Sequence, residues 1–263
     1  MKKLQVTNYK LKFLNLFLLS AFCILPSILF AQQTKISSTN SENKKVFYGL
    51  SLGPTIDWFS ATSNQLTRKN VKGGLITGIN LDINLTKERV FYFSTGVLVR
   101  YLQGDLSYQK EYDFRGFSPI DSTLITSTIT TYQTTYLTIP TGLKFRTNPS
   151  NSCVFVGKLG LYHNFRIGGK QFDSFTLPNL NANPNEYFVT TPKIKNDAAA
   201  LFAESAYIGL GFEYILANNF RAFLNVDYSC QFNYFSSKTK SNITDTRFKS
   251  IIHSLHIVVG ILF

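Results

Sequence analysis

Residues 74–86 read Gly-Leu-Ile-Thr-Gly-Ile-Asn-Leu-Asp-Ile-Asn-Leu-Thr, and this stretch decides the fold. Ile79, Leu81 and Ile83 are each followed by an Asn or an Asp, and Leu85 is followed by Thr86. A strand has a period of two, so one face of this segment is wholly apolar and the other is polar. Such a segment fits a sheet that meets lipid or a core on one side and water on the other.

The same alternation recurs in seven further segments: 46–58, 89–102, 132–146, 153–167, 205–216, 220–235 and 250–263. The connections between the eight segments alternate strictly in length. Long ones cover 59–73, 103–131, 168–204 and 236–249, and short ones cover 87–88, 147–152 and 217–219. Short periplasmic turns that alternate with long external loops are typical of outer-membrane barrels.

The sequence therefore predicts an all-β fold: an eight-stranded antiparallel up-and-down transmembrane β-barrel over residues 46–263, with both termini periplasmic. A soluble sandwich or a lipocalin-type barrel is the alternative, because its strands also alternate. Such folds have no reason to place every long connection at one end. Composition agrees with a lipid-facing surface, since aromatic residues reach 15% while charged residues are only 16%.

Aromatic residues gather near the ends of the expected strands, where amphipathic rings favour the lipid headgroup region. They are Tyr48, Trp58, Phe91, Tyr101, Phe145, Tyr214, Phe220, Tyr234 and Phe263. We expect two girdles. The last alternating strand ends on Phe263, which resembles the signal that the outer-membrane barrel insertion machinery reads.

The first 31 residues have the pattern of an export signal. A basic segment, 1–12, precedes an apolar segment, 13–30, and Ala31 is the small residue at the expected cleavage point. A polar linker, 32–45, follows. An uncleaved anchor helix is the alternative, which Pro26 and the polar linker disfavour.

Removal of the signal takes away four lysines and leaves 23 basic and 15 acidic residues, a net charge of +8 rather than +12. The basic residues do not cluster with aromatic residues in one motif, so we expect no nucleic-acid partner. Two cysteines remain, Cys153 and Cys230, at opposite heights of the expected barrel. We expect no disulfide between them.

The stretch Tyr-Leu-Thr-Ile-Pro-Thr-Gly-Leu-Lys-Phe at positions 136–145 resembles the fourth strand of PorT-like outer-membrane β-barrel proteins, whose pattern is Tyr-Leu-x-Ile-Pro-x-x-Leu-Lys-Tyr. Thr138 stands where an acidic residue is usual, and Phe145 where Tyr is frequent. The resemblance implies an eight-stranded barrel. It also implies a link to protein secretion and surface attachment, which is the role of the family's namesake.

An eight-stranded barrel is only wide enough to be filled by its own side chains, so passive porin activity is not expected. Charges inside such a lumen must be paired. The inward faces of the expected strands carry Asp82, Arg100, Lys144, Lys158, Arg166, Glu213, Arg221 and Asp227. We predict that Lys158, Glu213 and Asp227, on three consecutive strands, form one network with a structural role; a proton or substrate relay is the alternative.

The enzyme alternative, a lipid-modifying barrel, depends on His253 and His256. Neighbours on a strand face opposite sides, so His253 and Ser254 cannot act as base and nucleophile. His256 and Ser254 share a face but lack an acidic residue to orient the histidine. We therefore predict no enzyme and no catalytic residues. No metal-ligand spacing or cofactor motif is recognisable, and we expect neither a metal nor a cofactor.

The first and last long connections are basic, with Arg68, Lys69 and Lys72 in one and Lys238, Lys240, Arg247 and Lys249 in the other. Barrel closure makes these loops neighbours. We predict a rim of Arg68, Lys69, Lys238 and Lys240 that binds lipopolysaccharide phosphate; solvated loop charge is the alternative.

The expected role is that of a non-enzymatic structural or interaction protein that contacts outer-membrane lipid and lipopolysaccharide, and a protein partner through its loops or periplasmic turns. A small-molecule or lipid-binding barrel is a further alternative, which requires a ligand-sized cavity in the lumen.

Overall fold

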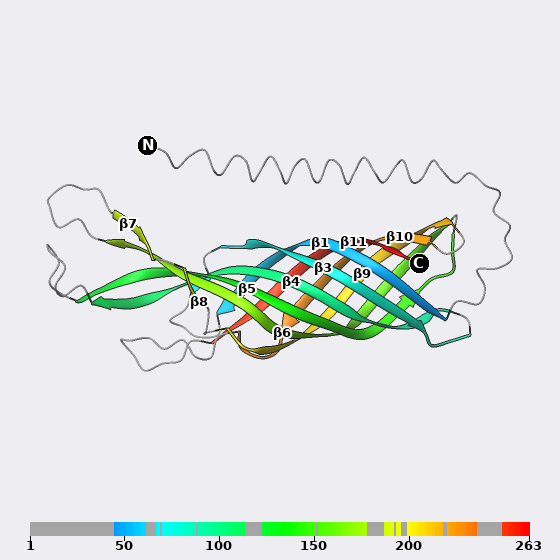
Figure 1. Ribbon diagram of the computed structural model, residues 1–263, viewed down its shortest axis with the longest axis horizontal. Coiled ribbons are helices and arrows are strands. Elements are labelled where there is room, and N and C mark those ends of the chain that lie inside the picture. The colour runs from blue at the N-terminus through cyan, green and yellow to red at the C-terminus, as the bar shows by residue number, and fades with distance from the viewer. Residues whose placement is uncertain are drawn as a thin grey trace. The chain divides into compact units, whose positions relative to one another are not determined.

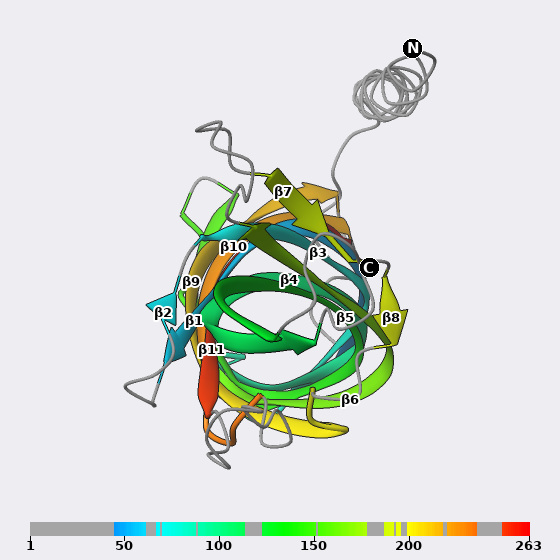
Figure 2. The same ribbon diagram turned by 90° about the vertical axis from the view of Figure 1, so that its left-hand side faces the viewer.

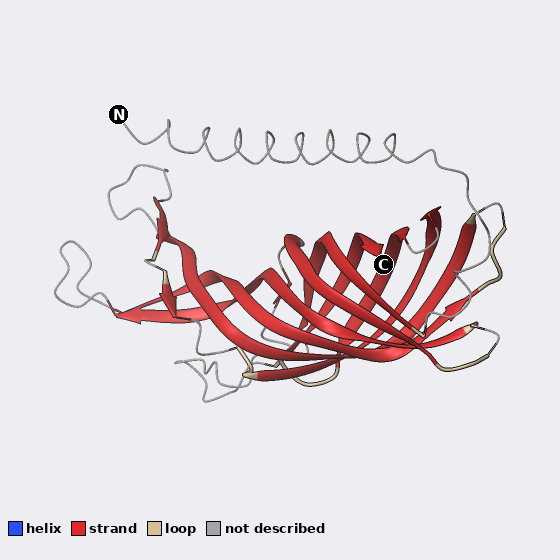
Figure 3. Cartoon of the chain, turned by 45° about the vertical axis from the view of Figure 1, so that its right-hand side comes forward, coloured by secondary structure: helices blue, strands red, loops and turns tan. Residues whose placement is uncertain are grey.

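The computed structural model describes residues 45–61, 67–68, 70–87, 89–113, 123–150, 152–177, 187–191, 193–195, 199–217, 220–235 and 249–263. The expected signal, 1–31, and nearly all of the linker, 32–45, lie outside these ranges. Within them the regular structure is entirely β-strand (Figure 3). The described residues contain no helix that is long and apolar enough to span a membrane.

The strands are β1 (Val46–Ala61), β2 (Thr67–Arg68), β3 (Lys72–Asn84), β4 (Phe91–Asp113), β5 (Thr123–Arg146), β6 (Cys153–Leu177), β7 (Tyr187–Thr190), β8 (Ile194–Lys195), β9 (Phe202–Ala217), β10 (Phe220–Gln231) and β11 (Ser250–Leu262). Eight of them, all but β2, β7 and β8, form a closed antiparallel ring in chain order (Figures 1 and 2). The ring closes because β1 pairs with both β3 and β11. The predicted eight-stranded antiparallel barrel is thus confirmed.

The stagger of the barrel follows from the register of its strands. A path through successive Cα partners that starts at Trp58 and passes through all eight strands returns to β1 at Tyr48, ten residues away. Eight strands with this stagger tilt by about 40° from the barrel axis. Trp58 and Tyr48 are then separated by about 25 Å along the axis, the height of the apolar band of a transmembrane barrel.

The outer wall between these two levels is apolar, and the lumen holds the charged and most of the buried polar side chains beside two apolar clusters. Leu50, Ile79 and Leu210 point outward with exposed fractions of 57%, 55% and 71%. Buried residues include Asp57, Asp82 and many Ser and Thr side chains. This reverses the arrangement of a water-soluble protein and is stable when the wall is solvated by lipid.

The short connections and the chain end share one end of the barrel, which we name the turn end; the opposite end is the loop end. The β3–β4, β5–β6 and β9–β10 connections lie at the turn end. There the backbone N–H of Phe263 donates to the carbonyl of Tyr48 at 2.8 Å. Outward rings pack in pairs at this level, with centroids 5.2 Å apart for Phe91 and Phe145.

Two of the expected long loops are wrong in extent, because much of each is strand. β4, β5 and β6 contain 23, 24 and 25 residues. A strand needs only about 9–11 residues to cross a bilayer. The three strands therefore continue beyond the loop end by roughly 30 Å and form a projecting sheet (Figures 1 and 3). The search for alternating apolar and polar residues missed the projecting sheet, because a strand above the membrane needs no apolar face.

The Ala-rich stretch around positions 198–203 forms no helix in the part of it that the structure describes. Ala203 lies in β9, with its side chain buried toward the lumen. Ala199 forms a bridge ahead of β9 and packs in the apolar cluster at the loop end. Pairing with β6 extends β9 to Phe202, since this satisfies backbone groups that a single helical turn would leave open.

Candidate functional site: lumen, outer wall and projecting sheet

A cluster of five charged side chains fills the lumen near the turn end, and we name it the lower ion cluster: Asp82 from β3, Lys144 and Arg146 from β5, Glu213 from β9 and Arg221 from β10. Lys144 Nζ lies 2.7 Å from Asp82 Oδ2 and 2.6 Å from Glu213 Oε1. Arg146 Nη2 contacts the same two oxygens at 2.7 and 2.9 Å. Arg221 Nη1 approaches Glu213 Oε2 at 3.2 Å. Each buried carboxylate is thus shared between cations, as a low-dielectric lumen requires.

Aromatic rings close the lumen below this cluster. The Arg146 guanidinium lies over the rings of Tyr92 and Phe47, 3.9 and 5.0 Å from their centroids. The Arg221 guanidinium lies 4.8 Å from the Phe47 centroid. Phe47 and Tyr92 are both buried. Cation–π contacts therefore hold an aromatic plug at the turn end.

The predicted network of Lys158, Glu213 and Asp227 is divided between two places. Lys158 Nζ pairs with Asp227 Oδ2 at 2.7 Å, whereas Glu213 belongs to the lower ion cluster. The register explains the division. Gly209 of β9 pairs with Lys158 on one side and Asp227 on the other, and Glu213 lies four residues nearer the turn end. A Cβ atom at Gly209 would overlap Asp227 Oδ1, so this glycine leaves the space in which the pair forms.

A third polar group lies nearer the loop end. Arg100 Nη2 donates to Asp57 Oδ1 at 2.8 Å and also contacts Ser254 Oγ. Thr55 Oγ1 donates to the second carboxylate oxygen of Asp57 at 2.8 Å. Most of the charged side chains that the sequence predicted on inward faces thus form ion pairs with one another. Which residues pair could not be read from their order in the sequence.

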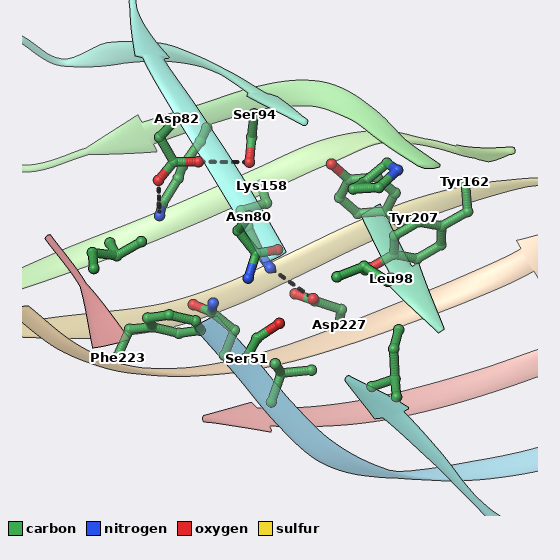
Figure 4. Close-up of a pocket in the computed structure, with 16 residues that line it drawn as sticks. Ser51, Asn80, Asp82, Ser94, Leu98, Lys158, Tyr162, Tyr207, Phe223 and Asp227 are labelled. Atoms are coloured by element: carbon green, nitrogen blue, oxygen red, sulfur yellow. Dashed lines mark hydrogen bonds and ion pairs between the residues drawn. The ribbon is translucent and has the colours of Figure 1, made fainter. Parts of the chain in front are cut away.

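A small cavity remains between the lower ion cluster and the Lys158–Asp227 pair (Figure 4). It measures about 40 Å³ and is lined by residues such as Ser51, Asn80, Tyr207 and Phe223. Such a volume holds one or two water molecules. Pockets for small organic ligands are about 300 Å³ or larger. This cavity gives no support to the small-molecule alternative.

Apolar side chains close the lumen at the loop end. The cluster consists of Phe59, Leu102, Leu106, Tyr108, Tyr132, Ala199, Phe235 and Ile252. Its rings pack tightly, with centroids 4.8 Å apart for Phe59 and Phe235. The lumen of the described barrel is therefore capped at both ends. Between the caps it is filled by the ion pairs and by a second apolar cluster that includes Tyr162, Tyr207 and Phe223.

The two histidines of the enzyme alternative lie on opposite sides of the wall. His256 is fully buried in the lumen, where Nε2 lies 3.0 Å from Ser229 Oγ and Nδ1 has no partner among the described residues. Ser254, its expected nucleophile, contacts Arg100 instead. His253 faces outward, stacks on Trp58 at 5.8 Å and lies 2.7 Å from Tyr228 Oη. The geometry thus brings neither histidine to an accessible nucleophile and an acid together.

Among the described residues, no group of three or more His, Cys, Asp and Glu side chains is placed to hold a metal ion. Cys153 and Cys230 are free.

In the predicted lipopolysaccharide rim, Lys69, Lys238 and Lys240 lie outside the described residues. The backbone of Arg68 is described, and it pairs with Leu106 of β4 rather than with β11. Lys72, of the same loop, forms an ion pair of 3.1 Å with Asp105.

Sequence reasoning missed a polar group on the outward wall. His163 Nε2 lies 2.9 Å from Thr141 Oγ1, and His163 Nδ1 lies 3.2 Å from Glu204 Oε1. The sequence does contain an indication of this group: His163 interrupts the otherwise apolar face made by Leu159, Leu161, Phe165 and Ile167. Its partner Glu204 was not recognisable, because the residues before 205 were expected to form a loop.

The sequence matches a family model described as outer membrane protein beta-barrel domain over residues 30–190. The chain belongs to this family. Its apolar band, its polar lumen and its alternating connections are therefore those of an integral outer-membrane barrel. The narrower PorT-like relationship stays a prediction.

Solved barrels show low similarity. Ail, the attachment invasion locus protein of Yersinia pestis in complex with sucrose octasulfate, has 12% identity and a TM-score of 0.33, and the match covers 84% of this chain and 100% of Ail. Neisserial surface protein A has 10% identity, a TM-score of 0.39 and coverages of 83% and 98%. The Escherichia coli outer membrane protease OmpT has 8% identity, a TM-score of 0.30 and coverages of 88% and 99%. Similarity at this level carries no argument about activity. A search of curated proteins finds no match.

Proposed function

We propose that this outer-membrane barrel is a non-enzymatic anchor that presents its projecting sheet at the cell surface for contact with a protein partner. The observation that carries the proposal is the length of β4, β5 and β6, which continue far beyond the membrane band above a lumen that is capped at both ends. A filled barrel has no conduit, so the exposed sheet is the part available for recognition.

The projecting sheet is held by its own polar contacts. Thr130 Oγ1 lies 2.6 Å from Asp173 Oδ1 and 3.0 Å from Tyr108 Oη. Asp105 accepts from Thr131 at 2.8 Å and from Asn70 at 3.0 Å. These contacts join β4, β5 and β6, and they supply the rigidity that a recognition surface needs.

The backbone offers a mode of recognition. Among the described residues, β4 pairs beyond the barrel with β5 on one side, and on the other side only with β2, at Leu106 and Ser107. The edge of β4 beyond Ser107 can therefore receive an extended segment of a partner by strand addition. The PorT-like resemblance suggests that such a partner belongs to secretion or surface attachment.

Orientation follows from barrel rules. Short turns are periplasmic in outer-membrane barrels, so the turn end and the chain end at Phe263 face the periplasm and the projecting sheet faces outward. The opposite orientation would place the projecting sheet in the periplasm and would contradict the proposed role at the cell surface.

A hairpin truncation tests the proposal. Gln109 and Ser127 are cross-strand partners, so residues 110–126 can be replaced by Asn-Gly, which makes a two-residue turn in the existing register. Gln109 is exposed, lies beyond the stretch of β4 that pairs with β2, and is retained in the truncated hairpin. A photo-crosslinking residue at position 109 should therefore capture a discrete partner in intact cells, and the truncated hairpin should lose it. Heat-modifiable migration on gels would check that the barrel still folds.

Capture that is unchanged by the truncation would contradict the role of the sheet. The crosslinker at the lipid-facing position of Ile79 serves as the matched control.

The non-enzymatic part of the proposal has its own test: His253→Phe together with His256→Gln should leave membrane lipids and partner capture unchanged in cells that carry the folded variant. A change in lipid composition on loss of the wild-type protein that the variant fails to restore would favour the lipid-modifying enzyme.

A further inference from the structure

The outward wall made by β5, β6 and β9 carries an ionisable pair inside the lipid band. His163 and Glu204 are direct cross-strand partners, and so are Phe165 and Phe202, which lie two residues nearer the loop end. The rings of Phe165 and Phe202, with centroids 5.1 Å apart, lie near the level of Trp58, and we name the outward rings at this level the outer girdle. His163 and Glu204 therefore lie about 5 Å deeper in the membrane than the girdle.

The surroundings of this pair are otherwise apolar. Leu161 and Phe165 on β6 and Ile208 on β9 all point toward lipid, with Ile208 61% exposed. Both ring nitrogens of His163 are engaged, one with Thr141 and one with Glu204. The side chain of Glu204 is 43% exposed, and within the described residues only its Oε1 has a partner. One carboxylate oxygen thus faces hydrocarbon.

Ionisable side chains that face lipid are rare because hydrocarbon solvates them poorly, and they generally meet a polar partner. Small neighbours permit close approach of another backbone. Ala206 lies beside Glu204 on the outward face of β9, and Thr141 and Ala206 flank Leu161 in the register. The wall thus combines one carboxylate oxygen without a partner among the described residues, Glu204 Oε2, with two small side chains, Thr141 and Ala206, on either side of Leu161.

We propose that this wall is the lateral interface with a second copy of the same chain, related by a two-fold axis along the membrane normal. The pair is self-complementary: each copy contributes the electropositive ring edge of an imidazole, His163, and the free oxygen of a carboxylate, Glu204. Two copies inserted in the same orientation place these groups at the same depth. The axis then sets the free Oε2 of Glu204 in one copy against the ring edge of His163 in the other, and each ring keeps its two nitrogen contacts within its own chain. This is the isologous contact that a two-fold dimer requires.

Crosslinking in native outer membranes tests the interface. In a background of Cys153→Ser and Cys230→Ser, Ala206→Cys places a thiol beside the pair on the proposed interface. Ile79→Cys places a thiol on the lipid-facing side of β3, on the opposite wall, and is the matched control. A short bifunctional maleimide should join two Ala206→Cys chains into a dimer and should leave Ile79→Cys chains single.

The polar pair is tested by Glu204→Leu and His163→Leu, which fit a lipid-facing wall. Each change should lower the dimerisation constant in proteoliposomes, measured by fluorescence counting of single barrels, roughly 3- to 30-fold, the range that polar contacts between membrane segments give. His253→Leu, on the outward face of β11, should have no effect.

Three results would overturn the proposal: equal crosslinking at positions 206 and 79, a crosslinked product that contains a different protein, or a dimerisation constant that Glu204→Leu leaves unchanged. Gel migration of each variant, heated and unheated, separates these results from a failure to fold. The hairpin truncation described above leaves this wall intact, so the two proposals can fail independently.

Discussion

Lys158 of β6 and Asp227 of β10 form an ion pair across β9, with Nζ 2.7 Å from Oδ2, because the strand between them presents Gly209 and no side chain. The ion pairs of the lumen therefore require glycine at specific positions as well as charged residues, because a side chain at Gly209 would occupy the space in which Lys158 and Asp227 meet. Both charged groups are largely shielded from solvent, with side-chain exposures of 12% and 3%.

Gly209→Ala should destabilise the barrel by about 2–5 kcal/mol, because the new methyl group would displace the Asp227 carboxylate from its buried partner. Urea unfolding of the refolded barrel in lipid vesicles would measure this. Gly157→Ala is the matched control on β6, since the nearest atom to its Cβ would be Phe145 Cδ2 at 3.9 Å. Equal stabilities of the two variants would contradict the spacing role of Gly209.

Lys158→Met and Asp227→Leu should each cost about 3–5 kcal/mol when made alone, because either change leaves a buried charge without its partner. The double variant should be more stable than both single variants, since two apolar side chains remove the desolvation cost together. A double-mutant cycle by urea unfolding gives the coupling. If the losses in unfolding free energy of the two single variants add up to the loss of the double variant, Lys158 and Asp227 contribute to stability independently, and the predicted coupling is wrong.

The pKa of Tyr108 is raised to about 12, chiefly by burial; the hydrogen bond with Thr130 lowers this pKa, and the nearby Asp173 raises it. Tyr108 lies in the projecting sheet beyond the membrane band. The folded-state pKa of Tyr108 exceeds the ordinary value near 10, so the folded protein favours the protonated phenol. The stability that the protonated Tyr108 side chain contributes is complete below pH about 10 and is lost as the pH rises toward about 12.

The ultraviolet absorbance of the phenolate, followed as a difference between the wild-type protein and Tyr108→Phe, would report this titration. Protease resistance of the projecting sheet should fall over the same pH range in the wild-type protein. A Tyr108 signal that titrates near pH 10 would show that the side chain is open to solvent.

Neutralising Arg68, Lys69, Lys238 and Lys240 together should reduce the lipopolysaccharide that co-purifies with the barrel, since each basic residue near an anionic membrane surface contributes about 1 kcal/mol at low salt. Lys72, which already pairs with Asp105, is the control position for a single neutralisation with little effect. Unchanged co-purification from the folded quadruple variant would reject this rim.

The membrane part of the fold was predictable because its signal is local. In the segment around Ile79, Leu81 and Ile83, the period of two depends only on the pleat of a strand and on the different solvents on its two faces. Connection length then distinguished one end of the barrel from the other. The extension of β4 to Asp113 and of β6 to Leu177 was not predictable in this way, since strands outside the membrane are stabilised by pairing with one another and need no apolar face.

The sequence by itself determined that charges such as Lys158, Glu213 and Asp227 face the lumen, because inward and outward positions alternate along every strand. Only the tertiary structure decided which of them meet. The ten-residue stagger of the closed barrel places Lys158 opposite Asp227 and carries Glu213 down to Lys144 and Arg146. The same register brings His163 to Glu204 on the outer wall, 41 positions apart in the chain, because pairing between distant strands is a property of the closed sheet and not of any single strand.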